Sequence, residues 1–237
     1  MDGGRRDEAR HADAAVEEWV FACWSTDGSL GAISGHRLLG RTAWYWAALV
    51  GVDRPLLHVA EWDVAVRADP MVVKAEVLWA EHTCDAPFEQ WTIGNETFAV
   101  ELDDPEQALG RAYGARRPIA FDLEWYATSP PTAVPGGYEQ VGSVHGRIDL
   151  VNEPAGPEGI DLEELYGRRW HRWGERLDPI VLDDARAHTG LRAPFAFPDG
   201  TVADWVLTPS GWRSRRRAGS PDRRWADPSP GAPVDAG

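Results

Sequence analysis

The chain has 237 residues, a formal net charge of −14 and two cysteines, and it is long enough for one large β domain or two small ones with a sizeable core. This charge repels phosphate backbones and anionic membranes, so we expect no nucleic-acid partner. The sequence shows neither a signal peptide nor a run of about 20 apolar residues, and we expect a cytoplasmic protein without membrane insertion.

Most of the chain predicts short antiparallel strands. Residues 1–14 are polar, and we expect them to be disordered. From residue 15 to residue 210, runs rich in Val, Ile and aromatic residues alternate with Gly, Pro and Asp, which is typical of an all-β barrel or sandwich. The runs that predict strands are residues 18–25, 42–51, 56–66, 71–82, 97–102, 118–127 and 138–150.

Helices and long loops are few in this prediction. Residues 104–114 begin with a capping Asp followed by Pro and end in Gly, which predicts one helix, and a second is expected near Asp183. Residues 152–159 predict a loop. The Arg- and Pro-rich residues 211–237 bury too little apolar surface to fold, so we expect a disordered tail.

Nine of the thirteen tryptophans lie within two residues of an Asp, Glu or His. Burial of a carboxyl against an indole ring raises the pKa of the carboxyl, so such a pocket could protonate an apolar substrate or simply hold it. Glu81 is the first candidate for this acid, because strand alternation places it in the row of Trp79; the alternative is a strand-end carboxylate in water. The aromatic residues expected to line the pocket are Trp44, Trp46, Trp62, Trp79, Trp91, Trp125, Tyr138 and Trp173.

Two further carboxyls and two histidines are candidate catalytic residues. Asp122 and Glu124 share one strand face, about 7 Å apart, where they form either an acid–base pair in a barrel lumen or a solvent-facing row. His58 shares an apolar row with Trp62, which is typical of a core histidine and also compatible with a proton acceptor. His171 is a second candidate proton acceptor or orienting group.

The sequence carries no specific motif for a metal or a cofactor. Residues 78–96 are dense in reactive side chains but lack HExxH or CxxC spacing, so we expect no metal site. GxSxG, P-loop and GxGxxG motifs are missing, which disfavours hydrolases, NTPases and dinucleotide-dependent enzymes. Any chemistry is therefore expected to need no cofactor, and Cys23 and Cys84 predict reduced thiols.

The segment GYEQVGSVHGRIDL, followed by RRWHRWG at residues 168–174, resembles the second half of the carotenoid-hydratase and hydroxyneurosporene-synthase-like proteins, a lipocalin-related superfamily. Arg169, His171, Trp173 and Gly174 match the RDHSWG-like turn of those proteins, whereas Trp170 and Arg172 replace its Asp and Ser.

This resemblance implies an antiparallel lipocalin-like barrel or sandwich. Its two halves, about 15–135 and 136–210, would enclose a hydrophobic ligand or merge into one sheet system. The resemblance also implies cofactor-free hydration, cyclisation or isomerisation of isoprenoid or polyketide-like molecules. The Trp at position 170 removes one acid of the family's turn.

Three functional hypotheses follow. The first is a cofactor-independent enzyme that starts such a reaction by protonating a hydrophobic small molecule, with Trp faces stabilising the cation by about 0.5–2 kcal/mol each. The second is a carrier that holds a lipid, terpenoid or steroid without chemistry. The third is a structural or partner-binding β protein, because thirteen tryptophans can fill a core without a ligand.

Overall fold

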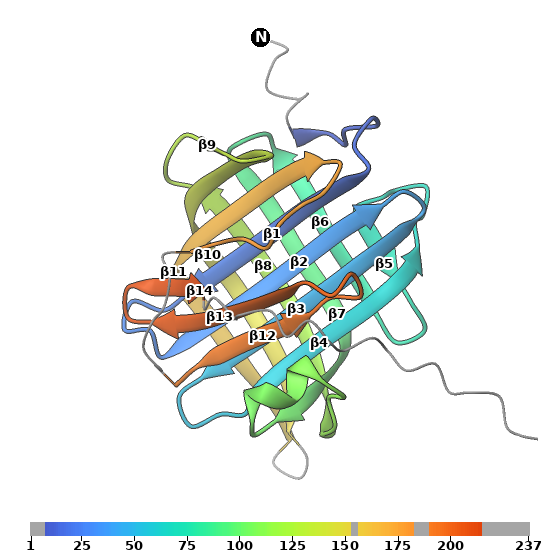
Figure 1. Ribbon diagram of the computed structural model, residues 1–237. Helices are drawn as coiled ribbons and strands as arrows, with labels where there is room; N and C mark the ends of the chain where they lie inside the picture. Colours follow the sequence, from blue (N-terminus) through green and yellow to red (C-terminus); the bar gives the residue numbers. More distant parts are fainter. Residues whose placement is uncertain (1–7, 153–155, 183–189, 215–237) are drawn as a thin grey trace, which may run out of the picture.

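Alternating apolar and polar residues form antiparallel strands along most of the chain that the computed structural model describes, namely residues 8–152, 156–182 and 190–214 (Figure 1). The strands are β1 (Val16–Trp24), β2 (Leu30–Leu39), β3 (Thr42–Gly51), β4 (Leu56–Ala65), β5 (Val72–Lys74), β6 (Trp79–Ala86), β7 (Gln90–Leu102), β8 (Ala115–Ala127), β9 (Thr132–Val134), β10 (Gly137–Asn152), β11 (Gly156–Gly174), β12 (Arg192–Ala196), β13 (Val202–Thr208) and β14 (Gly211–Ser214). A short 3₁₀ helix, η1, spans Pro105–Leu109.

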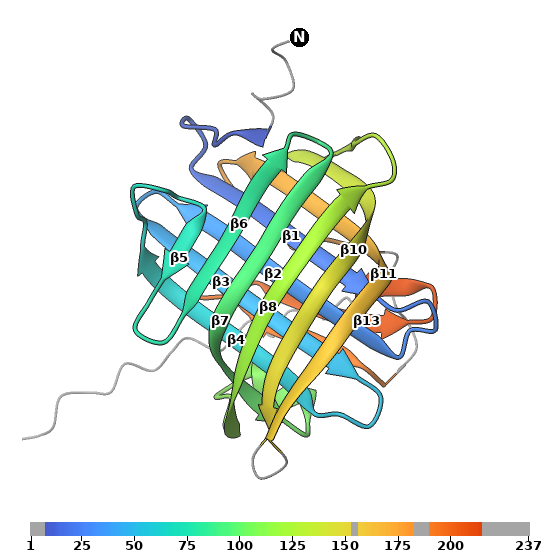
Figure 2. The ribbon, with the colours of Figure 1, turned by 180° about the vertical axis from the view of Figure 1, so that it is seen from behind.

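Eight of these strands close into a ring. Their order is β4-β3-β2-β1-β11-β10-β8-β7, and β4 pairs in turn with the end of β7. The first part of β7 pairs instead with β6, which carries β5 at its far edge, and β9 pairs with β10. Figures 1 and 2 show β1–β4 crossing β6–β8 on the two walls of this barrel. The ring is compatible with a lipocalin-like barrel, so the predicted all-β antiparallel fold class is confirmed.

Strand alternation divides the apolar side chains between two cores. Trp19, Phe21 and Trp125 belong to the core inside the barrel. Val20, Trp46 and other residues of the opposite strand faces pack under the three-stranded sheet β12-β13-β14, together with Phe195 of that sheet. Figure 1 shows this small sheet lying across the outside of β1–β4. The molecule therefore has three layers, and the front wall of the barrel is buried on both sides.

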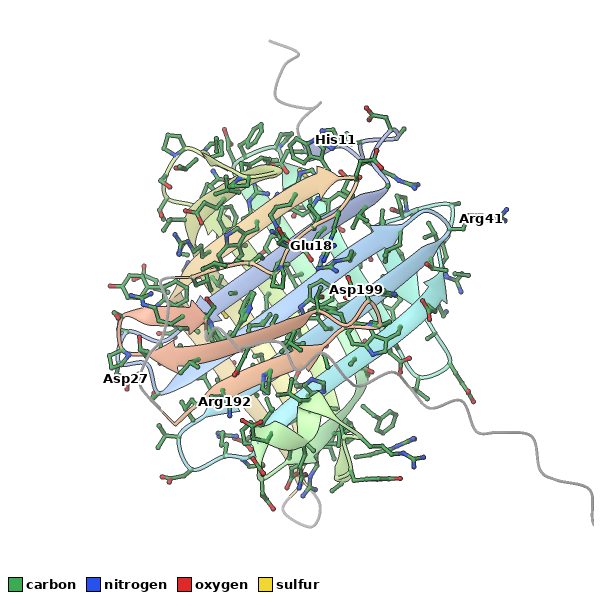
Figure 3. All side chains as sticks on the ribbon, in the orientation of Figure 1. His11, Glu18, Asp27, Arg41, Arg192 and Asp199 are labelled. Atoms are coloured by element: carbon green, nitrogen blue, oxygen red, sulfur yellow. The ribbon has the colours of Figure 1, made fainter. Side chains whose placement is uncertain are left out.

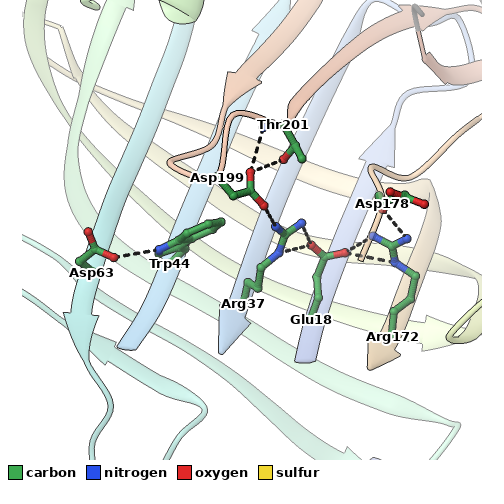
Figure 4. Close-up of polar contacts among 8 residues, drawn as sticks. All are labelled: Glu18, Arg37, Trp44, Asp63, Arg172, Asp178, Asp199 and Thr201. Atoms are coloured by element: carbon green, nitrogen blue, oxygen red, sulfur yellow. Dashed lines mark hydrogen bonds and ion pairs between the residues drawn. The ribbon is translucent and has the colours of Figure 1, made fainter. Parts of the chain in front are cut away.

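A buried row of ionic side chains helps fasten the small sheet to the barrel (Figure 4). Glu18 binds Arg37 at 2.6 Å and Arg172 at 2.5 Å, and Arg37 continues to Asp199 in the turn between β12 and β13, at 3.5 Å. Burial alone would raise the pKa of Glu18, but the two guanidinium groups outweigh it and lower the pKa. The guanidinium of Arg37 also lies over the ring of Phe197, 4.8 Å from its centre.

Several element boundaries differ from the sequence predictions. The run 71–82 divides into β5 and β6 around a turn, and the predicted helix 104–114 is reduced to the single 3₁₀ segment η1, which Asp104 caps. Strands occupy residues 156–159 of the expected loop and residues 211–214 of the expected tail. The sequence prediction missed β2, β9, β11 and β12–β14. Residues 168–174, which were compared with a turn of the similar proteins, lie in β11.

The predicted boundaries of the folded region also change. Glu8, within the N-terminal segment expected to be disordered, is buried against the barrel. The two expected halves share one sheet, which is the merged alternative, because β10 and β11 complete the ring with β1–β4, β7 and β8. The second predicted helix, near Asp183, and the rest of the tail lie outside the described residues. No helix within the described ranges is long and apolar enough to cross a membrane.

Candidate functional site

One row of inward-facing side chains crosses six neighbouring strands of the barrel. Residues that pair directly between strands point to the same side of a sheet, so the register of the ring determines the row. The residues in order from β10 to β4 are Tyr138, His171, Trp19, His36, Tyr45 and Glu61. This wall of an otherwise apolar barrel therefore carries a continuous polar and aromatic row.

The opposite wall supplies partners for the middle of the row. The hydroxyl of Tyr45 accepts a hydrogen bond from Asn95 Nδ2 at 2.7 Å and lies 3.1 Å from Ser34 Oγ. Ser34 Oγ also lies 2.9 Å from Nε2 of His82, on β6. The rings of His36 and His82 meet edge to face, 5.9 Å apart. Side chains from β2, β3, β6 and β7 thus form one buried polar cluster.

Both histidines of this cluster are neutral at physiological pH. His36 is 1% exposed, and burial lowers its pKa to about 4. Burial and the neighbouring His36 lower the pKa of His82 well below its usual range. Burial raises the pKa of Tyr45 to about 12, so its hydroxyl keeps its proton. The site holds neutral imidazoles beside a phenol, which are groups suited to general acid–base chemistry.

Several buried ring nitrogens of the interior lack a hydrogen-bond partner among the described residues. Both nitrogens of His36 and Nδ1 of His82 are in this state. The indole N–H groups of Trp19, Trp91 and Trp125, which belong to the same interior core, are also unpaired. Each such group costs about 1–3 kcal/mol, and native proteins retain few of them. This concentration of unpaired nitrogens marks the interior as a functional candidate.

A second buried polar group closes the end of the barrel at which β1 begins, where Figure 3 shows His11. Nε2 of His171 and Nδ1 of His11 each lie 2.8 Å from Oε1 of Glu17. Burial alone would raise the pKa of Glu17, but these contacts outweigh it and lower the pKa. Beside them, Glu8 binds the fully buried Arg169 at 2.6 Å.

Open space differs sharply between the interior and the other end of the barrel. An interior void beside Ser34 has a volume of about 10 Å³, enough for one water molecule. A cleft of about 450 Å³ lies at the turn between β3 and β4, within the size range of ligand sites. The interior-core residues Leu49 and Leu57 line this cleft, together with the ion pairs Arg54–Glu158 and Arg117–Glu101.

The structure places the predicted catalytic residues in four different environments. Glu81 is half-buried on the outer face of β6, where its carboxylate accepts a hydrogen bond from Thr83. Asp122 and Glu124 are exposed, while the alternate residues of β8 face the interior, as expected for the solvent-facing alternative. His58 packs beneath β12, where its Nε2 lies 3.2 Å from the carbonyl oxygen of Pro194. His171 alone among these five lies in the interior row.

The predicted aromatic lining is divided in the same way. Trp91 and Trp125 face the interior, and Tyr138 lies at its end beside Arg169. Trp125 lies flat against β10, where a Cβ at Gly142 would be 2.4 Å from the ring. The other predicted lining residues are outside the barrel interior or at its end: Trp44, Trp46 and Trp62 beneath the small sheet, Trp79 on the outer face of β6, and Trp173 stacked on His11.

Sequence reasoning missed His36, Tyr45 and Asn95 as site residues. His36 lies on β2, which the sequence did not predict as a strand. Tyr45 lies between Trp44 and Trp46, which were predicted to line the pocket in its place. Alternation in 42–51 does place Tyr45 opposite to Trp44 and Trp46, and this signal could have separated them. Glu61, half-buried and paired in register with Tyr45, has its pKa raised by burial and was missed as well.

Comparison with known proteins identifies the family but no characterised relative. No curated protein and no solved structure matches the chain. A family model described as a domain of unknown function, DUF7064, matches residues 4–189. This range includes the whole interior row and the end of the barrel at Glu8, and it stops before β12. Because the match covers most of the chain, the protein belongs to the DUF7064 family.

Proposed function

We propose that the protein is an enzyme that binds a small, mostly apolar molecule in the barrel interior and moves protons on it. The observation that carries the proposal is the buried, neutral and unpaired imidazole of His36 beside His82, in a core that also holds unpaired indole N–H groups. A ligand oxygen placed among these groups would accept the hydrogen bonds that the protein lacks, and this gain would favour binding.

The reaction class follows from the protonation states. A neutral imidazole of His36 or His82 can accept a proton from a ligand carbon or from water. Tyr45, which keeps its proton, can donate a hydrogen bond to a ligand oxygen. Glu61, whose pKa burial raises although Arg116 opposes this, is the candidate proton donor of the row. Removal of a proton at one atom and return at another gives isomerisation. Protonation of a double bond, attack of water or of a second double bond on the cation, and loss of a proton from the resulting cation to a neutral imidazole give hydration or, with an alkene as the product, cyclisation.

The substrate class combines the interior chemistry with the sequence resemblance. The interior is lined by Phe, Leu, Ile and Trp side chains, which favours a hydrophobic skeleton with few oxygens. The likeness of residues 138–174 to carotenoid-hydratase-like proteins supports isoprenoid and polyketide-like molecules as the first compounds to test. Binding requires the interior to open, because the described void holds about one water molecule.

Native mass spectrometry of the purified protein, followed by organic extraction, tests for a bound hydrophobic molecule. A panel of isoprenoid alcohols and polyketides is then incubated in D2O, and deuterium incorporation is followed by mass spectrometry. We expect incorporation with the wild type and with His145→Gln, which changes a histidine away from the cluster, and none with His36→Gln. Full incorporation by a folded His36→Gln variant would contradict the assignment.

A carrier is the second candidate, and the cleft lined by Leu49 and Leu57 favours it. Its volume of about 450 Å³ lies within the range of ligand sites, and its lining of aliphatic and charged side chains suits a lipid or terpenoid that carries a polar group, without any opening of the interior. A carrier would bind the panel without deuterium incorporation, and Leu57→Arg would abolish that binding while His36→Gln would not. A protein that binds nothing in either assay would support the third hypothesis, a filled structural core.

A further inference from the structure

Three side chains of the types that ligate metal ions lie together at the end of the barrel that carries residues 8–17. Nδ1 of His11, a carboxylate oxygen of Glu17 and Nε2 of His171 all lie within 4.8 Å of one another. The His171 side chain is 0% exposed and that of Glu17 is 3% exposed, whereas that of His11 is 20% exposed. The indole of Trp173 stacks on the His11 ring at 3.8 Å, so His11 is oriented although it lies near the surface.

The hydrogen bonds of the neighbouring residues determine which ring nitrogen of His171 carries a proton. Arg169 holds the carboxylate of Glu8 through two contacts, of 2.6 and 3.2 Å. Tyr138 donates its hydroxyl proton to the same carboxylate at 2.7 Å. Because that proton is already used, the 3.2 Å contact between the Tyr138 oxygen and Nδ1 of His171 is satisfied only if Nδ1 is the donor.

With Nδ1 as the donor, a neutral His171 ring has no proton on Nε2, the nitrogen that faces Glu17. A neutral imidazole that carries its proton on Nδ1 presents a lone pair at Nε2, and this lone pair faces the Glu17 carboxylate at 2.8 Å. Two electron-rich atoms at this separation require a positive charge between them. That charge comes either from a second proton on the imidazole or from a metal ion held between the two atoms.

We propose that His11, Glu17 and His171 bind one divalent transition-metal ion through these three atoms, with Zn²⁺ as the ion that best suits the donor set. Two imidazole nitrogens and one carboxylate leave a fourth position for water, and the hydrogen bond from Nδ1 of His171 to Tyr138 is the orienting contact that metal-bound histidines usually make. The ion would fasten the segment around His11 across the barrel end. This inference is independent of proton transfer at His36, and either proposal can fail alone.

The test uses the full-length protein after treatment with EDTA and removal of the chelator. Zn²⁺ binding is measured by isothermal titration calorimetry, and the melting temperature is recorded with and without the ion. We expect one Zn²⁺ per chain and a higher melting temperature with Zn²⁺. His11→Ala, at the most exposed of the three ligands, should weaken binding by at least about 100-fold, whereas His145→Ala should bind as the wild type does.

A second variant keeps the test decisive if His11→Ala proves poorly folded. His11→Cys replaces the imidazole with a thiolate ligand, so it should retain binding and give a sulfur-to-metal charge-transfer band with Co²⁺. Two results would overturn the proposal: a wild-type protein that binds no Zn²⁺, which would identify the contact as an imidazolium–carboxylate pair, or a folded His11→Ala protein that binds Zn²⁺ as tightly as the wild type.

Discussion

Folding removes the His36 ring from water, and within the described residues no hydrogen bond replaces its contacts with water. Its two ring nitrogens are buried without partners, while its ring lies 5.7 Å from that of Trp19. Tyr45, next in the row, has the opposite character, because its hydroxyl contacts both Ser34 and Asn95. Both nitrogens of His36 are thus available for a ligand, whereas Tyr45 also joins the two walls through the hydrogen bond that it accepts from Asn95.

Protonation of His36 should couple pH to stability. Its pKa is about 4 in the folded state and about 6.5 when unfolded, so above pH 6.5 its contribution to stability is complete. Between pH 6.5 and 4 the unfolded chain binds the proton more tightly, and the free energy of unfolding should fall by about 1.4 kcal/mol per pH unit. Urea titrations of the wild type and His36→Gln should show this slope reduced in the variant. Equal slopes would contradict the assignment.

The contacts of Tyr45 lead to a second expectation at this scale. Tyr45→Phe leaves Nδ2 of Asn95 without its 2.7 Å acceptor in a site that excludes water, and should lower the free energy of unfolding by about 1–3 kcal/mol. Tyr126→Phe, on the outside of the barrel, is the matched control and should change it by less than about 0.5 kcal/mol. Urea denaturation followed by Trp fluorescence measures both, and similar losses would argue against a special role for Tyr45.

At the scale of the strand, consecutive residues serve different layers. In β1, Glu17 and Trp19 face the interior, while Glu18 between them faces the small sheet. Every strand of the front wall repeats this division, as His36 and Arg37 show on β2. One segment therefore contributes both to the candidate site and to the ionic row that anchors the outer layer.

Strand alternation explains what the sequence could and could not predict. Trp125 and its alternate neighbours on β8 were assigned to one face correctly, because alternation is local. The interior row could not be predicted from the sequence, because it depends on the register between strands far apart in the chain. The pairing of Trp19 with His171 is an example. Glu81 shares a strand face with Trp79 as predicted, but this face is the outer one, because a turn separates β5 from β6 and Ala80 rather than Glu81 lies beside the buried Val73.

The ionic row of Glu18, Arg37 and Arg172 is expected to stabilise the docking of the small sheet on the barrel. Glu18→Gln would remove the carboxylate shared by two buried guanidinium groups, leaving Arg172 without a charged partner and Arg37 with only its 3.5 Å contact to Asp199, and should cost about 3–5 kcal/mol of stability. Glu158→Gln, which alters an ion pair at the molecular surface, should cost no more than about 1 kcal/mol. Thermal unfolding compares the two. A loss for Glu18→Gln as small as that for Glu158→Gln would mean that the row contributes little to the docking of the small sheet.

At the scale of the whole molecule, closure of the ring depends on residues distant in sequence. β1 pairs along its full length with β11, so Val16 lies opposite Gly174. Contacts of this kind form only after most of the chain has been synthesised, and they make folding slow. The interior row is itself assembled across this junction, because Trp19 and His171 come from the two paired strands. The candidate site therefore exists only in the closed ring.

This dependence predicts that residues 1–135 do not fold alone. Without β10 and β11, one edge of β1 and one edge of β8 lose their partners, and the interior core is opened to water. We expect the fragment to aggregate or to give a near-UV circular dichroism spectrum without fixed Trp signals, whereas residues 1–214 should give the signals of the full chain. Adding residues 136–214 as a separate chain should restore those signals if the two pieces can pair. A fragment 1–135 with sharp Trp signals by itself would show instead that the first half is an autonomous unit, and that the ring closes only after it has folded.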